Sequence, residues 1–162
     1  MREEKPVILI LEDDPNLLRK LKEIFEEEKF EVLDCSNISE AMVIWSKNKS
    51  CIDVISTDTN MSSNGLKKEE SDLTENGCHS GWFWLFNYVF KDTEHPFPVD
   101  KVFLLSEYIN NLERYCSERK KYGYKELMLL KKKKHLINKG DPKGANNILL
   151  NIIKKELPFE SK

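Results

Sequence analysis

Short apolar runs alternate along this chain with segments in which apolar residues recur every three or four positions. The apolar runs lie at residues 7–11, 30–35, 52–56, 101–105 and 126–130. Runs of this length are typical of strands that a parallel sheet buries on both faces. The segments between and after them predict helices that begin near residues 15, 39, 81, 107 and 142. This alternation predicts an α/β fold with one doubly wound, five-stranded parallel sheet, built from five β–α units with right-handed crossovers.

Two of the predicted helices begin with an aspartate followed by a proline. Asp14 precedes Pro15, and Asp141 precedes Pro142. An aspartate side chain accepts hydrogen bonds from the free amides of a first helical turn, and proline fits the first helical position. Both pairs therefore predict a helix N-terminus, and metal binding is the alternative role for Asp14.

The periodic pattern lapses between the third predicted strand and the third predicted helix. Residues 62–80 are rich in Ser, Asn, Gly, Lys and Glu, which predicts a long exposed loop, an irregular insertion of a kind that is often functional or mobile. The helix predicted at residues 81–90 is unusually aromatic. One helical stripe cannot bury all of its rings, so the helix is either deeply packed or presents some of them to a partner.

Length and composition fit one globular domain, which we predict to cover residues 1–162. Apolar residues make up 40% of the chain, charged residues make up 33%, and the formal net charge is −2. So small a net charge gives no general attraction to nucleic acid or to anionic lipid. The lysine run at residues 131–134 is more typical of a solvated surface than of a nucleic-acid site.

The sequence shows no membrane segment and no disulfide framework. Its most apolar stretch, residues 82–90, is too short to cross a bilayer, and the charged N-terminus lacks the apolar core of a signal peptide. The cysteines are far apart, and the histidines show no metal-ligand spacing. We therefore expect a cytoplasmic protein with reduced thiols and no membrane partner.

Polar and charged residues follow four of the five predicted strands. Glu12 and Asp13 follow the first strand, Asp58 the third, Ser106 the fourth and Lys131 the fifth. In an open doubly wound sheet, ligands bind outside the carboxyl ends of the strands. These residues are therefore the candidates for a functional site.

Carboxylates gathered at one edge of a sheet repel one another unless something compensates their charge. Two unit charges about 4 Å apart interact by roughly 4 kcal/mol at an effective dielectric constant near 20. Such a cluster either raises the pKa of one acid or holds a cation. Mg²⁺ fits, because it takes oxygen ligands from one or two carboxylates and keeps waters that a phosphate oxygen can replace.

Taken together, four segments resemble the motifs of response regulator receiver domains, the CheY-like superfamily. These segments are residues 8–15 (ILILEDDP), 57–61 (TDTNM), 104–106 (LLS) and 129–131 (LLK). The resemblance covers nearly the whole chain, and it implies a flavodoxin-like sheet with strand order 2-1-3-4-5. It also implies a protein of two-component signalling that is not an enzyme beyond its own phosphorylation and dephosphorylation.

The resemblance implies a role for each acid at the strand ends. Asp58 would be the phosphoacceptor, the nucleophile that attacks a phosphoryl donor. With Asp58, Asp13 would bind the Mg²⁺ cofactor directly, Glu12 would bind it through water, and Asn60 would offer its backbone carbonyl. These roles agree with the chemistry of phosphoryl transfer, in which positioning and charge neutralisation supply most of the catalysis.

The resemblance also implies a cation and a hydroxyl for the phosphoryl group. Lys131 would pair with it, with Lys132 as an alternative in the same lysine run, and Ser106 would donate a hydrogen bond to it. A helix N-cap is the simpler role for Ser106. The chain departs from the family pattern at three positions: Lys132 replaces a proline, Glu107 replaces a small residue, and Met128 replaces an aromatic residue.

Three functions are compatible with these residues. The first is a receiver phosphorylated on Asp58 by a sensor histidine kinase or a phosphotransfer protein, which switches binding to a downstream protein because no room remains for a DNA-binding domain. The second is a pseudo-receiver scaffold that binds a partner without phosphorylation, favoured by the departures from the family pattern. The third is a small α/β enzyme, which lacks support because neither GxxxxGK[ST] nor GxGxxG is present.

Overall fold

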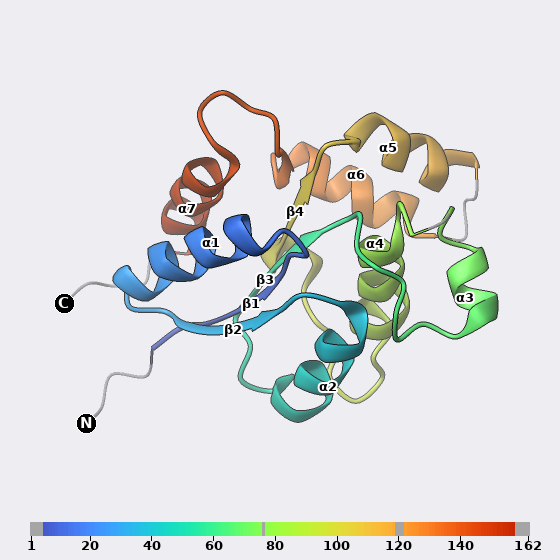
Figure 1. Ribbon diagram of the computed structural model, residues 1–162, viewed down its shortest axis with the longest axis horizontal. Coiled ribbons are helices and arrows are strands. Elements are labelled where there is room, and N and C mark those ends of the chain that lie inside the picture. The colour runs from blue at the N-terminus through green and yellow to red at the C-terminus, as the bar shows by residue number, and fades with distance from the viewer. Residues whose placement is uncertain (1–4, 76, 119–121, 158–162) are drawn as a thin grey trace.

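Five parallel strands form one sheet in the computed structural model, which describes residues 5–75, 77–118 and 122–157. Their order is β2-β1-β3-β4-β5, which confirms the predicted flavodoxin-like topology (Figure 1). The strands are β1 (Val7–Leu11), β2 (Glu31–Cys35), β3 (Val54–Asp58), β4 (Val102–Ser106) and β5 (Leu136–Asn138). Leu11 pairs with Thr57, and Asp58 pairs with Leu105, so the carboxyl ends of the central strands lie at one edge.

Helices cover both faces of the sheet (Figure 1). Helices α1 (Pro15–Glu27) and α7 (Ala145–Glu156) pack on one face, and α2 (Ile38–Asn48), α4 (Ser80–Trp84), α5 (Ile109–Glu118) and α6 (Tyr124–Lys132) pack on the other. Successive β1 residues alternate between two apolar cores: Ile8 and Ile10 join the core under α1 and α7, and Leu9 and Leu11 join the opposite core. No helix among the described residues is long and apolar enough to cross a membrane.

The two Asp-Pro pairs have different structures. Asp14 is the N-cap of α1, and its side chain accepts hydrogen bonds from the backbone N–H groups of Asn16 (2.9 Å) and Leu17 (3.2 Å), as predicted. The helix start predicted at Pro142 is wrong, because α7 begins at Ala145. The Asp141 side chain closes a tight turn with the backbone N–H of residue 143 at 2.9 Å instead of capping a helix.

The fifth strand lies later in the chain than predicted. Residues 126–130 belong to helix α6, and this segment buries Leu127 and Leu130 while Leu129 stays 38% exposed. A spacing of three between buried positions suits a helix, whereas a strand would place Leu127 and Leu129 on the same face. A short apolar run cannot distinguish a strand from a buried helical turn, which explains the error. The fourth crossover therefore contains two helices, α5 and α6, and β5 follows them.

The insertion at residues 62–80 is more ordered than the predicted loop. It contains the short helix α3 (Lys68–Asp72), whose Glu70 accepts a hydrogen bond from the Tyr88 hydroxyl at 2.5 Å. The Tyr115 hydroxyl of α5 donates to the Leu73 carbonyl at 2.6 Å. These contacts fasten the insertion to the helices around it, with residue 76 outside the described part.

The aromatic segment after the insertion belongs to the core. It consists of α4 followed by a π-helical turn, η1 (Leu85–Phe90), and a short 3-10 helix, η2 (Val99–Lys101), precedes β4. Trp82 and Trp84 are fully buried. Core packing therefore accounts for both tryptophans. The helix predicted over residues 107–121 corresponds to α5, and residues 119–121 lie outside the described chain.

Candidate functional site

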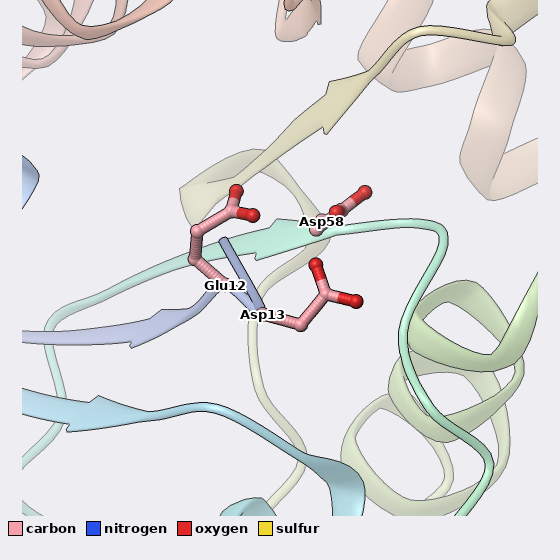
Figure 2. Close-up of side chains that lie close together, drawn as sticks. All are labelled: Glu12, Asp13 and Asp58. Carbon is pink, nitrogen blue, oxygen red and sulfur yellow. The ribbon is translucent and has the colours of Figure 1, made fainter. Parts of the chain in front are cut away.

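Three acids meet where β1 and β3 end (Figure 2). Glu12 and Asp13 follow β1, and Asp58 is the last residue of the neighbouring strand β3. One carboxylate oxygen from each lies within 4.8 Å of the other two. Glu12 and Asp58 are buried, whereas Asp13 is exposed. The structure thus brings together three of the four residues predicted to bind a metal ion.

Backbone amides orient the two buried carboxylates. Asp58 Oδ1 accepts a hydrogen bond from the Asn60 N–H at 2.9 Å, and Glu12 Oε1 accepts one from the Asp14 N–H at 3.0 Å. Glu12 Oε2 is buried without a hydrogen-bond partner in the described chain. A buried carboxylate oxygen without a partner is costly unless a cation or water satisfies it. Asn60, the fourth predicted metal residue, is exposed and lies two residues after Asp58.

The cation of the site is Lys139, which the sequence analysis missed. Its ammonium donates to Asp58 Oδ2 at 2.6 Å and to Glu12 Oε1 at 2.8 Å. The Lys139 side chain is only 11% exposed. Lys139 directly follows β5, and its backbone N–H donates to the Ser106 carbonyl at 3.1 Å. The sheet itself therefore fixes the position of this lysine.

The prediction of Lys131 as the phosphate-binding cation is wrong, because Lys131 lies in α6 and not at a strand end. Its ammonium pairs with Glu113 of the neighbouring helix α5, 2.8 Å from Oε1. The alternative, Lys132, is the exposed last residue of the same helix. The sequence contains one weak indication of Lys139: it follows Leu-Ile-Asn at residues 136–138, a short run that could form a strand.

Because the site lysine is Lys139 and not Lys131, two of the departures from the family pattern fall at other residues. The residue after the site lysine, where the family has proline, is Gly140 and not Lys132. The residue three positions before it, where the family has an aromatic side chain, is Leu136 and not Met128. Both positions still differ from the family pattern, although the residues are not the ones expected.

Burial and charge shift the pKa values of the three paired groups. Burial and the Asp58 charge raise the pKa of Glu12 to about 7, against the opposing effect of Lys139. Burial also raises the pKa of Asp58, although the ammonium of Lys139 opposes the rise. Burial would lower the pKa of Lys139, but the two carboxylates outweigh it and raise that pKa. Lys139 is therefore charged at neutral pH, whereas Glu12 titrates near neutrality.

Ser106, the last residue of β4, is buried beside the acids but is held by other groups. Its Oγ accepts hydrogen bonds from Thr59 Oγ1 at 2.8 Å and from the Tyr108 N–H at 3.0 Å. No hydrogen bond to Asp58 is present in the described structure. The Tyr108 contact satisfies an amide at the start of α5, so the hydroxyl has part of the capping role that was the alternative to phosphate binding.

A cleft of about 390 Å³ opens above the acids. It is bordered by the β1–α1 junction, the ends of β3 and β5, and the β4–α5 junction. Its lining residues are Asp13, Asp14, Asn16, Leu17, Lys20, Asp58, Asn60, Glu107, Tyr108 and Lys139. Glu107, the acid found where the family has a small residue, thus borders the same space as Asp58. The cleft is large enough for a metal ion with its waters and a small phosphorylated group.

Cysteines and histidines take no part in this site. Among the described residues, the Glu12, Asp13 and Asp58 cluster is the one group of His, Cys, Asp or Glu that could hold a metal ion. All four cysteines are free thiols, two of them buried. The described part of the chain therefore points to a hard, oxygen-binding cation.

Comparisons with known proteins agree with this geometry. Residues 8–67 match the family model of the response regulator receiver domain. A crystal structure of a response regulator receiver domain protein from Clostridium thermocellum shares the fold, with a TM-score of 0.50 and 20% identity over 96% of this chain and 99% of that one. No curated protein matches the sequence. The family match over residues 8–67 and the shared fold over nearly the whole chain together support a CheY-like receiver domain.

Proposed function

We propose that this protein is a Mg²⁺-dependent phosphoacceptor receiver in which Asp58 accepts the phosphoryl group. One observation carries the proposal: the Asp58 carboxylate is clustered with the acids Glu12 and Asp13 and is paired with the Lys139 ammonium, which also contacts Glu12. A nucleophile beside both a fixed cation and a pair of acids that can hold a metal ion is the arrangement that phosphoryl transfer requires.

The donor set fits Mg²⁺. Carboxylates of Asp13 and Asp58 would bind the ion directly, and Glu12 would bind through water, with the Asn60 carbonyl as a further oxygen donor. The partnerless, buried Oε2 of Glu12 supports this assignment, because a metal-bound water would satisfy it. The ion, when bound, would neutralise charge on the acids and on the incoming phosphoryl oxygens.

The residues of the chain have separate tasks in the transfer. One Asp58 carboxylate oxygen attacks the phosphorus, a new O–P bond forms, and the bond between phosphorus and the donor's leaving group breaks with its electron pair. The N–H of Asn60 orients the nucleophile. Lys139, paired with Asp58 before the reaction, balances the charge of the phosphoryl oxygens after it. Desolvation at the buried carboxylate strengthens each of these interactions.

The family implies the classes of partner. A sensor histidine kinase or a phosphotransfer protein would supply the phosphoryl group, and a downstream protein would read the phosphorylated state. The acyl phosphate would shift a two-state equilibrium of the surface around β4 and β5, because Ser106 and Lys139 follow those strands.

Acetyl phosphate, a small phosphoryl donor, provides a direct test. With Mg²⁺, the intact mass of the protein should rise by that of one phosphoryl group, and borohydride reduction should locate the modification at Asp58. Asp58→Asn, which keeps the size of the side chain, is the matched control and should stay unmodified. Modification of another residue, or none in folded wild-type protein, would refute the proposal.

The second candidate is a pseudo-receiver that binds its partner without phosphorylation. Glu107 favours it, because this exposed acid borders the cleft through which a negatively charged donor must approach Asp58. In this case partner binding would be the same for wild type, Asp58→Asn and protein treated with acetyl phosphate. Binding that changes on phosphorylation would exclude it.

A further inference from the structure

The Ser106 hydroxyl is hydrogen-bonded to groups other than the acids of the site. It accepts the Thr59 hydroxyl at 2.8 Å and the Tyr108 N–H at 3.0 Å, and it is not among the cleft-lining residues. We propose that Thr59 is a positioning residue that holds Ser106 away from Asp58 in the unphosphorylated protein and thereby lowers the affinity of the site for a phosphoryl group. This inference rests on the proposed function.

The position of Thr59 in the sheet makes this contact firm. Thr59 directly follows Asp58, and its backbone N–H donates to the Leu105 carbonyl at 3.1 Å, which continues the pairing of β3 with β4. Its carbonyl accepts the N–H of Gly81 at 3.1 Å. Thr59 is buried, as is Ser106. Because both of its backbone groups are hydrogen-bonded, the Thr59 backbone stays in place if the Ser106 side chain turns.

A hydroxyl that turns toward a phosphoryl group on Asp58 must leave Thr59 behind. Within the described part of the chain, the Thr59 hydroxyl has no other hydrogen-bond partner, so it would then be buried without a hydrogen bond. Leaving a buried polar group unpaired is costly, whereas removing it together with its bond is not. This reasoning holds whichever hydroxyl donates the proton, because the contact exists only in the unphosphorylated arrangement.

The hydrogen bond from the Tyr108 amide holds Ser106 in the same position as the hydrogen bond between Thr59 and Ser106, which we call the latch. Ser106 also gives up this bond when it turns, and Tyr108 itself lines the cleft and is 51% exposed. The start of α5 would therefore change its hydrogen bonding together with Ser106. In two-state terms, Thr59 stabilises the resting conformation, and a ligand that needs the other conformation binds more weakly by the same factor.

Thr59→Val tests the latch, because valine keeps the shape and branching of threonine but lacks its hydroxyl. The measurement is the affinity for beryllofluoride, a phosphoryl mimic, with saturating Mg²⁺, followed by ¹⁹F NMR. Loss of one hydrogen bond corresponds to an affinity about five- to tenfold higher than in wild type. The affinity for Mg²⁺ alone should be unchanged, which separates positioning of Ser106 from a general effect on the site.

Three variants complete the design. Thr59→Ser restores the hydroxyl and should return the affinity to the wild-type value. Thr59→Ala replaces valine if the methyl group prevents folding, and it should raise the affinity in the same direction. In a Ser106→Ala background, Thr59→Val should have no effect on beryllofluoride affinity, because the latch has lost its target.

The outcomes separate the two proposals. Wild type that binds beryllofluoride with the same or higher affinity than Thr59→Val refutes the latch and leaves the phosphoacceptor proposal in place. An equal gain in the Ser106→Ala background also refutes the latch, because the effect then does not act through Ser106. If neither wild type nor Thr59→Val binds, the proposed function fails and the latch fails with it.

Discussion

The two halves of this protein contribute to the site in different ways. The first half, from β1 to β3, has strands of five residues and supplies the three acids, and it carries the match to the family model. The second half, from the insertion to α7, has a final strand of only three residues and supplies Ser106 and Lys139. The three clustered acids and the lysine that pairs with two of them thus come from opposite halves of the chain.

This difference shows where sequence alone can locate a site. The acids lie at the end of β3 or directly after β1, two strands that are buried in full, so their positions in the sheet are predictable from the sequence pattern. Lys139 follows the edge strand β5. The apolar run of this strand is short and comes soon after four consecutive lysines in the sequence. The first half, with the clearer pattern, supplies the acids proposed to bind the metal ion, and the second half supplies the lysine that balances their charge.

Gly81→Ala should have the largest effect on stability, because Gly81 lies where the second half of the chain contacts the end of β3. Gly81 lies in α4 against the end of β3, and an added Cβ would lie 1.9 Å from the Asp58 carbonyl oxygen. Because backbone must move to admit it, we expect a loss of about 4 kcal/mol in the free energy of unfolding. Urea denaturation measures this loss. Gly140→Ala, whose Cβ would meet only the Asn138 side chain at 3.4 Å, should change stability by less than about 0.5 kcal/mol.

The helical assignment of residues 126–130 is tested by a pair of alanine variants. Leu127 is fully buried and Leu129 is 38% exposed. We expect Leu127→Ala to cost about 3 kcal/mol and Leu129→Ala less than about 1 kcal/mol in the free energy of unfolding. A strand would place both leucines on one face, so equal costs would contradict helix α6.

A comparison of Lys139→Ala with Lys131→Ala tests which lysine pairs with Asp58 in the site. Loss of Lys139 removes the charge that faces the phosphoryl group, so phosphorylation of Asp58 by acetyl phosphate should slow by about 100-fold. Among the described residues, Lys131 pairs only with Glu113 on the helical surface, and its loss should leave the rate unchanged. Both phosphorylation rates are measured by intact mass. If the lysine run supplied the lysine of the site, Lys131→Ala would be the slower variant and Lys139→Ala would keep the wild-type rate.

The pH dependence of metal binding tests the acids of the first half. Burial and the Asp58 charge raise the pKa of Glu12 to about 7, so this carboxyl is largely protonated below neutrality. Mg²⁺ requires the ionised form, so its affinity should fall as pH falls, by up to about tenfold per unit below pH 7, and level off above it. Calorimetric titrations between pH 5.5 and 8.5 measure this slope. Glu12→Gln should bind Mg²⁺ more weakly with a shallower slope, and an equally steep slope would assign the proton elsewhere.

Much of the fold follows from the sequence. The strand order and the α1 cap at Asp14 agree with prediction, because buried runs and capping residues leave strong local signals. The positions of β5 and of the α7 start do not, because tertiary packing decides whether a short apolar run is helical. Lys139 was missed for the same reason: its role depends on which strand it follows, not on its neighbours.

Some features of the site are set only by three-dimensional packing. The hydrogen bond between Thr59 and Ser106 joins residues 47 positions apart, and no local pattern marks it. The insertion was predicted as an exposed loop, yet contacts from Tyr88 and Tyr115 order it against the core. Such long-range polar contacts depend on the register of β3 with β4 and on side-chain orientation, neither of which the periodicity determines.

The central claim is that the acids at the ends of β1 and β3 bind one metal ion next to the Lys139 ammonium. Mn²⁺ prefers the same oxygen ligands as Mg²⁺, and it broadens the NMR signals of nearby amides. Titration of Mn²⁺ into ¹⁵N-labelled protein should first broaden the amides of Asp13, Asp58 and Lys139 and leave those of residues 131–134 sharp. Selective broadening at residues 131–134, or no selective broadening at the three strand ends, would contradict the claim.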